Sequence, residues 1–233
     1  MTTKETMNTY RKNAIMAGVL YIAATVATSF TVIIISSMLD APDYLVRIAA
    51  NEFQVMMAAL LMLIDVVAVV SIGIVLYPIL KKHIEALALG YAIARAIEGV
   101  LFTVYVIGIL SLLTLSQEFV KAEAPDASYF QTGGAVLLAA SDWAFLLGLR
   151  LAFVVSALLL NFSLYQTRLI PRWLSGWGFV GAILVFVLLL SRFFSINLSE
   201  ILDLPIALQE MVFAVWLIVK GFNPTAIASE SAK

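Results

Sequence analysis

The chain has 233 residues, of which 63% are hydrophobic and only 12% are charged. Soluble globular domains are about 45–50% apolar and about 25% charged, and the mean hydropathy of +1.03 also lies outside that class. A soluble fold of this size cannot bury so much apolar surface, because a small fold leaves a large share of its surface in contact with solvent. The solvent must therefore be lipid for much of the chain, which has room for roughly six or seven transmembrane helices of about 20 residues each.

The counts of two residue types narrow the chemistry further. There is no cysteine and one histidine, His83, which excludes disulfides, cysteine nucleophiles and multi-histidine metal sites. The net charge of −1 gives no electrostatic basis for binding nucleic acid. We therefore predict no cofactor, no metal site and no nucleic-acid partner.

The first two predicted helices are long apolar runs. Residues 13–39 carry no charge and follow Arg11 and Lys12. This run is longer than the apolar segment of about 7–15 residues found in a cleaved signal peptide, so we expect a retained span near residues 14–39. The second run, residues 53–80, is interrupted only by Asp65.

The third predicted helix covers residues 86–116 and contains Arg95 and Glu98. Because its uncharged part is shorter than the whole helix, we expect it to be tilted or partly interfacial at its first turns. The stretch that follows, residues 116–134, contains a proline, paired glycines and several charges. It is the longest polar connection in the chain.

The fourth predicted helix covers residues 135–166, with Arg150 inside it. The segment 129–141 is apolar but too short to span a membrane alone. It forms either a re-entrant or interfacial turn, or an extension of the fourth helix. We favour the extension.

The last two predicted helices are shorter. Residues 173–191 lie between Arg172 and Arg192, and residues 203–220 carry Glu210 near their middle. The predicted organisation is an N-terminal tail (1–12), a single six-helix transmembrane domain (13–221) and a C-terminal tail (222–233).

The distribution of lysine and arginine predicts the orientation. If the N-terminus is cytoplasmic, nine of these residues lie on the inner side and three, Arg47, Lys121 and Arg192, on the outer side. Loops on the cytoplasmic side carry the excess of positive charge in membrane proteins. An even number of spans then places both termini in the cytoplasm.

Six ionisable residues remain inside the spans or at their edges. They are Asp65, Arg95, Glu98, Asp142, Arg150 and Glu210. A charge at the centre of a membrane helix costs about 2.5–3.5 kcal/mol on insertion scales, so such groups usually pair and face protein or water. Four acids against two arginines leave a surplus of negative charge, which a proton, a cation or water would have to compensate.

Depth estimates suggest which of these groups meet. Counted at ~1.5 Å per residue from the outer helix ends, with Trp143 as the most secure start of the fourth helix, Asp65, Arg150 and Glu210 lie at depths of about 18, 11 and 9 Å. Their side chains lean toward the outer side, since all three helices run inward and helical side chains lean toward the N-terminus. The hypothesis is that Arg150 bridges Glu210, with Asp65 as a further partner and Asp142 near the mouth of the cluster.

A second polar group lies on the third predicted helix. Arg95 and Glu98 are neighbours at i and i+3, and Tyr91, Phe102 and Tyr105 continue the same face. This polar and aromatic stripe should face the interior of the bundle.

These charges have two interpretations. They form a binding site for a ligand, ion or proton, or they only fix the packing of the helices. An enzyme is disfavoured because no nucleophile, metal site or acid–base constellation is present. The serines have no nearby histidine, and the surroundings of Asp65 and Asp142 lack the glycine-rich context of an intramembrane aspartyl protease.

Several long segments carry a family resemblance. They are EALALGYAIARAIEGVLF, LLTLSQEFVKAEAPDASYFQ, AASDWAFLLG, RLIPRWLSGWGFVGAIL and PIALQEMVFAVWLIVKGFNP. From Ala14 to Asn223 the chain resembles a bacterial family of integral membrane proteins catalogued as a domain of unknown function. The resemblance implies a bacterial inner-membrane location and a multi-span helical fold, and it assigns no activity, cofactor or functional residue.

The sequence thus predicts an all-α polytopic membrane helix bundle of six spans in the bacterial inner membrane, with the lipid bilayer as its partner. Its predicted function is binding or transport of a small cation, proton or polar solute at the intramembrane charges. The alternative is a non-transporting lipid-binding, regulatory or scaffold protein in which the same charges are structural.

Overall fold

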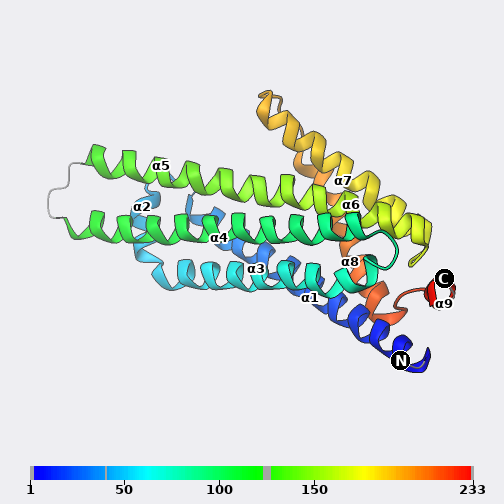
Figure 1. The fold of residues 1–233 in the computed structure, drawn as a ribbon. Helices are drawn as coiled ribbons and strands as arrows, with labels where there is room; N and C mark the ends of the chain where they lie inside the picture. The colour runs from blue at the N-terminus through cyan, green and yellow to red at the C-terminus, as the bar shows by residue number, and fades with distance from the viewer. Residues whose placement is uncertain (1–2, 40, 123–126, 232–233) are drawn as a thin grey trace. The chain divides into compact units, whose positions relative to one another are not determined.

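Long apolar runs form helices throughout the part of the chain that the computed structural model describes, which is residues 3–39, 41–122 and 127–231. A continuous helix satisfies every backbone polar group internally, which a chain surrounded by lipid requires. The α-helices, traced in Figure 1, are α1 (Thr3–Leu39), α2 (Tyr44–Ala50), α3 (Glu52–Leu80), α4 (Glu85–Lys121), α5 (Ala127–Leu146), α6 (Phe153–Thr167), α7 (Arg172–Phe193), α8 (Leu204–Val219) and α9 (Pro224–Ser231).

Within these described residues, six helical segments are long and apolar enough to cross a membrane. They are Met7–Leu39, Glu52–Leu80, Glu85–Lys121, Ser128–Thr167, Arg172–Phe193 and Glu200–Val219. Large apolar side chains such as Val67, Ile74 and Val100 remain exposed on these segments, as expected of helices that face lipid. The prediction of an all-α, multi-pass membrane protein with six spans is confirmed.

The segment 129–141 extends the fourth span, as favoured from the sequence. It belongs to α5, which begins at Ala127 and continues through the π-helical turn Leu147–Ala152 into α6. The paired glycines do not interrupt the helix, and Gly134 lies so close to Tyr44 that a Cβ there would be 2.5 Å from the tyrosine hydroxyl. The span therefore begins before the predicted residue 135. Gly134 lies inside the helix because its lack of a side chain lets α5 pack closely against Tyr44 of α2.

Three further helical segments lie outside the predicted spans. The first helix begins at Thr3, inside the predicted N-terminal tail, and α2 and α9 occupy stretches predicted as connection and tail. The helices α2 and α9 are too short for hydrophobic periodicity to distinguish them from loops. Residues 123–126, part of the predicted polar connection, lie outside the described residues.

The chain falls into two compact units. The first unit comprises Met1–Ile22, Ala68–Glu98 and Leu149–Lys233, and the second comprises Ala23–Val67 and Gly99–Gly148. The prediction of a single domain with the boundaries 13–221 stays a prediction. Each unit is described by itself below.

In the first unit, small residues allow close helix packing. α7 packs against α6 and α8. A Cβ on Gly178 would lie 2.3 Å from Oδ1 of Asn161 in α6, and one on Gly181 would lie 3.0 Å from Cβ of Ile206 in α8. The glycine positions of α7 therefore serve packing within the chain, a use of small residues that is common between membrane helices.

The beginning of α1 and the end of α8 also meet in the first unit. Arg11 donates hydrogen bonds from Nη1 to the carbonyl of Leu217 at 3.1 Å and from Nη2 to that of Ile218 at 2.6 Å. These carbonyls belong to the last turn of α8 and have no acceptor role inside the helix. A cation at this position satisfies them and also interacts favourably with the helix dipole.

The second unit is held by aromatic and hydroxyl contacts. Phe145 of α5 lies 5.7 Å from Phe102 and 5.1 Å from Tyr105 of α4, measured between ring centroids. Thr31 of α1 donates a hydrogen bond of 3.1 Å to the carbonyl of Ala58 in α3. A hydroxyl that bonds to a neighbouring helix stabilises membrane helix pairs in this way.

Candidate functional site

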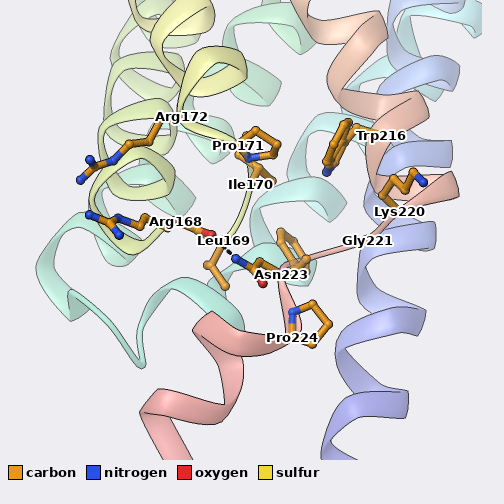
Figure 2. A pocket seen from close by; sticks show the side chains of 11 residues that line it. Arg168, Leu169, Ile170, Pro171, Arg172, Trp216, Lys220, Gly221, Asn223 and Pro224 are labelled. Atoms are coloured by element: carbon orange, nitrogen blue, oxygen red, sulfur yellow. Dashed lines mark hydrogen bonds between the residues drawn. The ribbon is translucent and has the colours of Figure 1, made fainter.

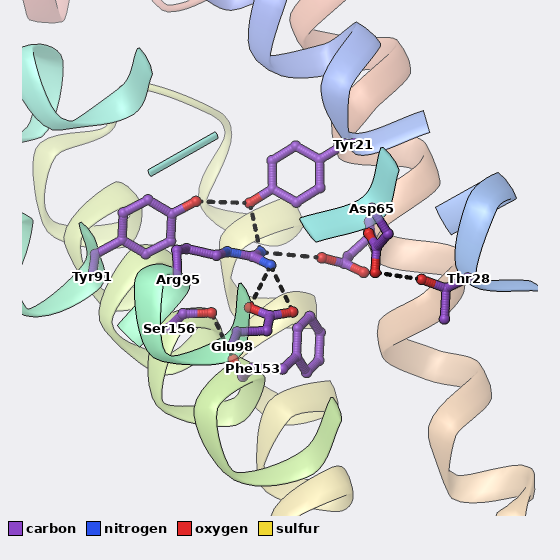
Figure 3. A network of polar contacts seen from close by, with 9 residues as sticks. Tyr21, Thr28, Asp65, Tyr91, Arg95, Glu98, Phe153 and Ser156 are labelled. Carbon is purple, nitrogen blue, oxygen red and sulfur yellow. Dashed lines mark hydrogen bonds and ion pairs between the residues drawn. The ribbon is translucent and has the colours of Figure 1, made fainter. Parts of the chain in front are cut away.

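Arg95 lies at the centre of a buried polar cluster in the first unit (Figure 3). Its Nη1 lies 3.0 Å from Oε2 and 3.3 Å from Oε1 of Glu98, so the two residues form a close ion pair along α4. Both side chains are 3% exposed. The predicted i, i+3 neighbours therefore form a buried pair on the interior face.

Two groups from other helices complete the coordination of Arg95. Its Nη2 donates a hydrogen bond of 3.1 Å to the hydroxyl of Tyr21 in α1 and lies 3.6 Å from Oε1 of Glu210 in α8. The Glu210 side chain is 19% exposed, so it is the more accessible of the two carboxylates. The arginine thus links α1, α4 and α8.

Aromatic rings enclose the guanidinium group. Its central carbon lies 5.3 Å from the ring of Tyr21, 5.7 Å from that of Tyr91 and 5.5 Å from that of Phe153. The hydroxyls of Tyr21 and Tyr91 share a hydrogen bond of 3.1 Å. Ring faces stabilise a desolvated cation, so these contacts help to keep the positive charge of Arg95 inside an apolar bundle.

The polar and aromatic stripe predicted on α4 faces the interior. Its members, Tyr91, Arg95, Glu98, Phe102 and Tyr105, are all buried. This part of the prediction is confirmed, because a helix that exposes one face to lipid turns its costly polar groups to the other.

The predicted bridge from Arg150 to Glu210 is wrong. Arg150 pairs through Nη2 with Glu200 and, at 2.9 Å, with Oδ2 of Asp203, both in the short 3-10 helix that precedes α8. Arg192 at the end of α7 lies 3.2 Å from the other oxygen of Glu200. This second cluster contains two cations and two anions and is formally neutral.

The Arg150–Glu210 bridge was wrongly predicted because the depth of each residue was counted from the outer end of its helix. Counting from the outer ends placed Arg150 near a helix start, but the helix begins at Ala127, far before that point. Counted instead from the ends predicted to be cytoplasmic, Arg150 lies about 25 Å from Thr167 and Asp203 about 24 Å from Val219. The same count places Arg95 about 15 Å from Glu85, and Glu210 about 14 Å from Val219, which reproduces both observed pairs.

The remaining two predicted site residues belong to the second unit. Asp65 is 1% exposed and accepts a hydrogen bond of 2.6 Å from the hydroxyl of Thr28 in α1 (Figure 3). Asp142 lies exposed on α5. Because Arg150 belongs to the first unit, the predicted places of the two aspartates beside that arginine stay predictions.

A narrow cavity lies beside the Arg95 cluster. Tyr21, Arg95, Asn161, Gln209 and Glu210 line it with apolar residues of α6 and α8. The cavity has room for about one water molecule. Gln209 contributes to its wall and is fixed by a hydrogen bond of 3.3 Å from Nε2 to the carbonyl of Leu174 in α7.

Several members of these clusters are not predicted from the sequence. Glu200 lies outside the predicted spans, Asp203 is only the first residue of the last predicted helix, and Tyr21 lies in an uncharged run. Matching helix depths from the opposite membrane face is the signal that would have found them. In the described residues no group of three or more histidines, cysteines, aspartates or glutamates could hold a metal ion.

The family described as a domain of unknown function (DUF4386) matches residues 16–221. The chain belongs to this family. The matched range contains every ionisable residue of both clusters, Arg95, Glu98, Glu210 and the Arg150 group, together with Asp65 and Asp142. The resemblance predicted from the sequence is confirmed, and its predicted limits, Ala14 and Asn223, lie within two residues of the match.

No curated protein and no solved structure matches the chain. The DUF4386 family is described as a domain of unknown function. The Arg95 cluster offers one carboxylate in excess of its arginine, partial access at Glu210 and a cavity of about one water.

Proposed function

We propose that the protein binds a proton or a small cation at Glu210, inside the membrane. The supporting observation is the charge balance of the Arg95 cluster. Its ionisable members are one arginine, two carboxylates and the hydroxyls of Tyr21 and Tyr91. With both carboxylates ionised the cluster carries a formal charge of −1, which is costly in an apolar surrounding.

The geometry favours Glu210 over Glu98 as the residue that accepts the ligand. Glu98 holds Arg95 with both oxygens, at 3.0 and 3.3 Å, whereas Oε1 of Glu210 lies 3.6 Å from the same guanidinium group. Glu210 is also the more exposed of the two. A proton or cation on Glu210 would neutralise the surplus charge and leave the close pair intact.

The size of the cavity narrows the ligand class. Room for about one water molecule suits a proton, a hydronium ion or a small partly dehydrated cation. A larger polar solute does not fit, because a buried cavity would have to enclose the whole molecule and this cavity holds about one water. The proposal therefore concerns binding of a small ion and does not involve enzymatic chemistry.

We further propose that the protein lies in a bacterial inner membrane with both termini in the cytoplasm. The excess of lysine and arginine on one side of the predicted spans supports this orientation. The contact between Arg11 and the end of α8 is consistent with an even number of spans, because it brings the two ends of the span series together.

The alternative is a purely structural cluster. The closed Arg95–Glu98 pair and its aromatic enclosure favour it, since such a group would lock α1, α4 and α8 together without any ligand. In that case Glu210 would only complete the lock, and the protein would act as a scaffold, regulatory or lipid-binding component.

Ligand-dependent stability separates these two functions. A ligand that binds only the folded protein raises its stability with the logarithm of ligand concentration. The unfolding temperature of the purified protein would be measured in detergent against pH and against Li⁺, Na⁺ and K⁺ at constant ionic strength. The wild type should be stabilised by falling pH or by one of the cations.

Glu210→Gln should abolish this dependence and remain folded, because the amide removes the surplus charge. Glu118→Gln is the matched control, since Glu118 is an exposed carboxylate that pairs with Lys121 on the surface. If folded Glu210→Gln responds to pH and cations as the wild type does, Glu210 is not the site and the structural function stands. Ion flux in proteoliposomes then decides whether binding leads to transport.

A further inference from the structure

A basic pocket lies in the first unit, away from the Arg95 cluster (Figure 2). The turn between α6 and α7 forms one wall, and the segment after α8 forms the other. The pocket is open and has about 1060 Å³ of empty space, part of which is bulk solvent. Figure 2 shows Arg168 and Arg172 on one side of it and Lys220 on the other.

The three cations are available to an external anion. All are exposed, and none forms an ion pair with a described side chain. Arg172 donates from Nε to the carbonyl of Tyr165 at 3.4 Å and stacks over that ring at 4.9 Å. These contacts fix the arginine stem and leave its positive charge without an anionic partner among the described residues.

The backbone holds the two walls together. The amide of Asn223 donates to the carbonyl of Leu169 at 2.8 Å, and its Nδ2 donates to the carbonyl of Arg168 at 3.4 Å. Arg168 takes a left-handed conformation with φ of 56° to end α6, and Gly221 turns the chain after α8 with φ of 72°. The pocket is therefore preformed by the fold.

The start of α7 adds to the positive potential. This helix has 22 residues and begins at Arg172 after Pro171, without a side-chain cap. The uncapped amides at a helix N-terminus carry partial positive charge and favour anions, phosphate groups among them. The helix end thus acts together with the arginines that flank it.

The pocket lies where the apolar spans end. One span ends at Thr167, the next begins at Arg172, and the last ends at Val219, so the three cations mark the boundary of the apolar region. Trp173 stacks on Trp177 at 6.4 Å and meets Trp216 edge-on at 6.4 Å. Tryptophan concentrates at the level of lipid headgroups, and Trp216 also lines the pocket.

We infer that this pocket binds the phosphate headgroup of an anionic phospholipid. Arg168, Lys220 and the start of α7 would hold the phosphate, while the partly exposed apolar wall at Trp216 and Pro171 would contact the glycerol and upper acyl chains. Basic pockets between membrane helices bind anionic headgroups by the same chemistry. The inference concerns a different site from Glu210 and does not depend on it.

The test compares lipid binding by matched charge variants. The purified full-length protein would be titrated with phosphatidylglycerol and with phosphatidylcholine, and bound lipid would be counted by native mass spectrometry. The wild type should retain phosphatidylglycerol in preference to phosphatidylcholine. Arg168→Gln/Lys220→Gln should weaken phosphatidylglycerol binding by about tenfold or more, because each basic residue near the headgroups contributes substantially to attraction.

Lys12→Gln/Lys81→Gln is the control, because it removes the same charge from exposed lysines outside the pocket. It should bind phosphatidylglycerol as the wild type does. Equal loss in both double variants would show that bulk charge, not the pocket, attracts lipid, and unchanged binding in Arg168→Gln/Lys220→Gln would also overturn the inference. If that variant does not fold, Lys220→Gln alone is measured against Lys81→Gln by the same criteria.

Inorganic phosphate distinguishes a lipid from a free anion. Millimolar phosphate should leave bound phosphatidylglycerol in place, because the apolar wall and the tryptophans contribute to holding a lipid. Complete displacement of the lipid by phosphate at that concentration would assign the pocket to a free phosphate and overturn the choice of phospholipid.

Discussion

Arg95 shows how a single cation is kept inside an apolar chain. Its charge is balanced by Glu98 and Glu210, its donors bond to a tyrosine hydroxyl, and aromatic rings cover its faces. Burying a charge is tolerated only when pairing and hydrogen bonding compensate for lost solvation. The buried carboxylates and the tyrosine hydroxyl in turn depend on Arg95 as their partner.

Arg95→Gln should be strongly destabilising. Glutamine removes the cation that pairs with Glu98 and Glu210, and breaking a buried pair by removing one partner costs about 3–5 kcal/mol. Denaturant unfolding in detergent would measure this loss. Arg47→Gln, which breaks an exposed pair with Asp43, should change stability by less than about 1 kcal/mol, and a similar loss in both variants would contradict the prediction.

The two carboxylates of the cluster should differ in their tolerance of substitution. Glu98→Gln removes the close anionic partner of Arg95 and leaves Glu210 at 3.6 Å and the Tyr21 hydroxyl at 3.1 Å. We therefore expect a loss of about 1.5–3 kcal/mol, the range of a charged hydrogen bond. Glu210→Gln removes the surplus charge and should be nearly neutral or stabilising at neutral pH. The same unfolding measurement checks this order, and a larger loss at Glu210 would reverse it.

Among the helices, α7 depends most clearly on small residues. Gly178 and Gly176 are two positions apart on this helix but face different surroundings. A Cβ at Gly178 would collide with the amide of Asn161, whereas nothing lies within 4 Å of one at Gly176. The Asn161 amide is itself fixed by a hydrogen bond of 2.9 Å to the carbonyl of Ala157, so it yields little space.

Gly178→Ala should therefore destabilise the protein by about 1–3 kcal/mol, the usual cost of overpacking. Gly176→Ala should be neutral or slightly stabilising, because alanine is the better helix former. Thermal unfolding of the two variants side by side measures the difference. Equal unfolding temperatures for Gly178→Ala and Gly176→Ala would contradict the prediction, because they would show that α6 and α7 accommodate the added methyl group without loss of stability.

At the level of elements, the sequence predicted the features that depend on the length of apolar runs. All six spans follow from runs of apolar residues, and the position of Arg95 and Glu98 on the interior face follows from helical spacing. The π-helical turn that carries Arg150 could not be predicted, because it depends on an extra residue accommodated by packing and not on residue type. The short helix α2 was missed for the related reason that its stability comes from contacts beyond its seven residues.

At the level of the whole chain, the choice of charge partners was the least predictable feature. Six intramembrane charges allow several pairings of similar formal energy, and only the relative depth of the helices selects among them. That depth depends on where each span begins, and the fourth span begins at Ser128, inside a stretch that reads as a polar connection. A helix start misplaced there moved Arg150 from the Glu200–Asp203 pair to Glu210.

The predicted orientation has a direct test, because the chain contains no cysteine and any introduced thiol is unique. Lys121→Cys, at the end of α4, should react with a membrane-impermeant maleimide in intact spheroplasts. Lys81→Cys, between α3 and α4, should react only after the membrane is permeabilised. The buried Ala182→Cys is the unlabelled control, and the opposite labelling pattern would invert the topology.

The contacts of Arg11 and Tyr21 also bear on how the protein is made. Both residues lie on the earliest of the six described spans, whereas the carbonyls that Arg11 binds lie 206 and 207 residues later. Phe213, which packs edge-on against Tyr21 at 5.5 Å, lies on the sixth of these spans. During synthesis the early helices must therefore wait in the bilayer with their polar groups incompletely matched. Insertion of α8 is the step that closes the first unit, and a nascent chain stalled before it would present an incomplete polar face to the membrane's proteolytic quality control.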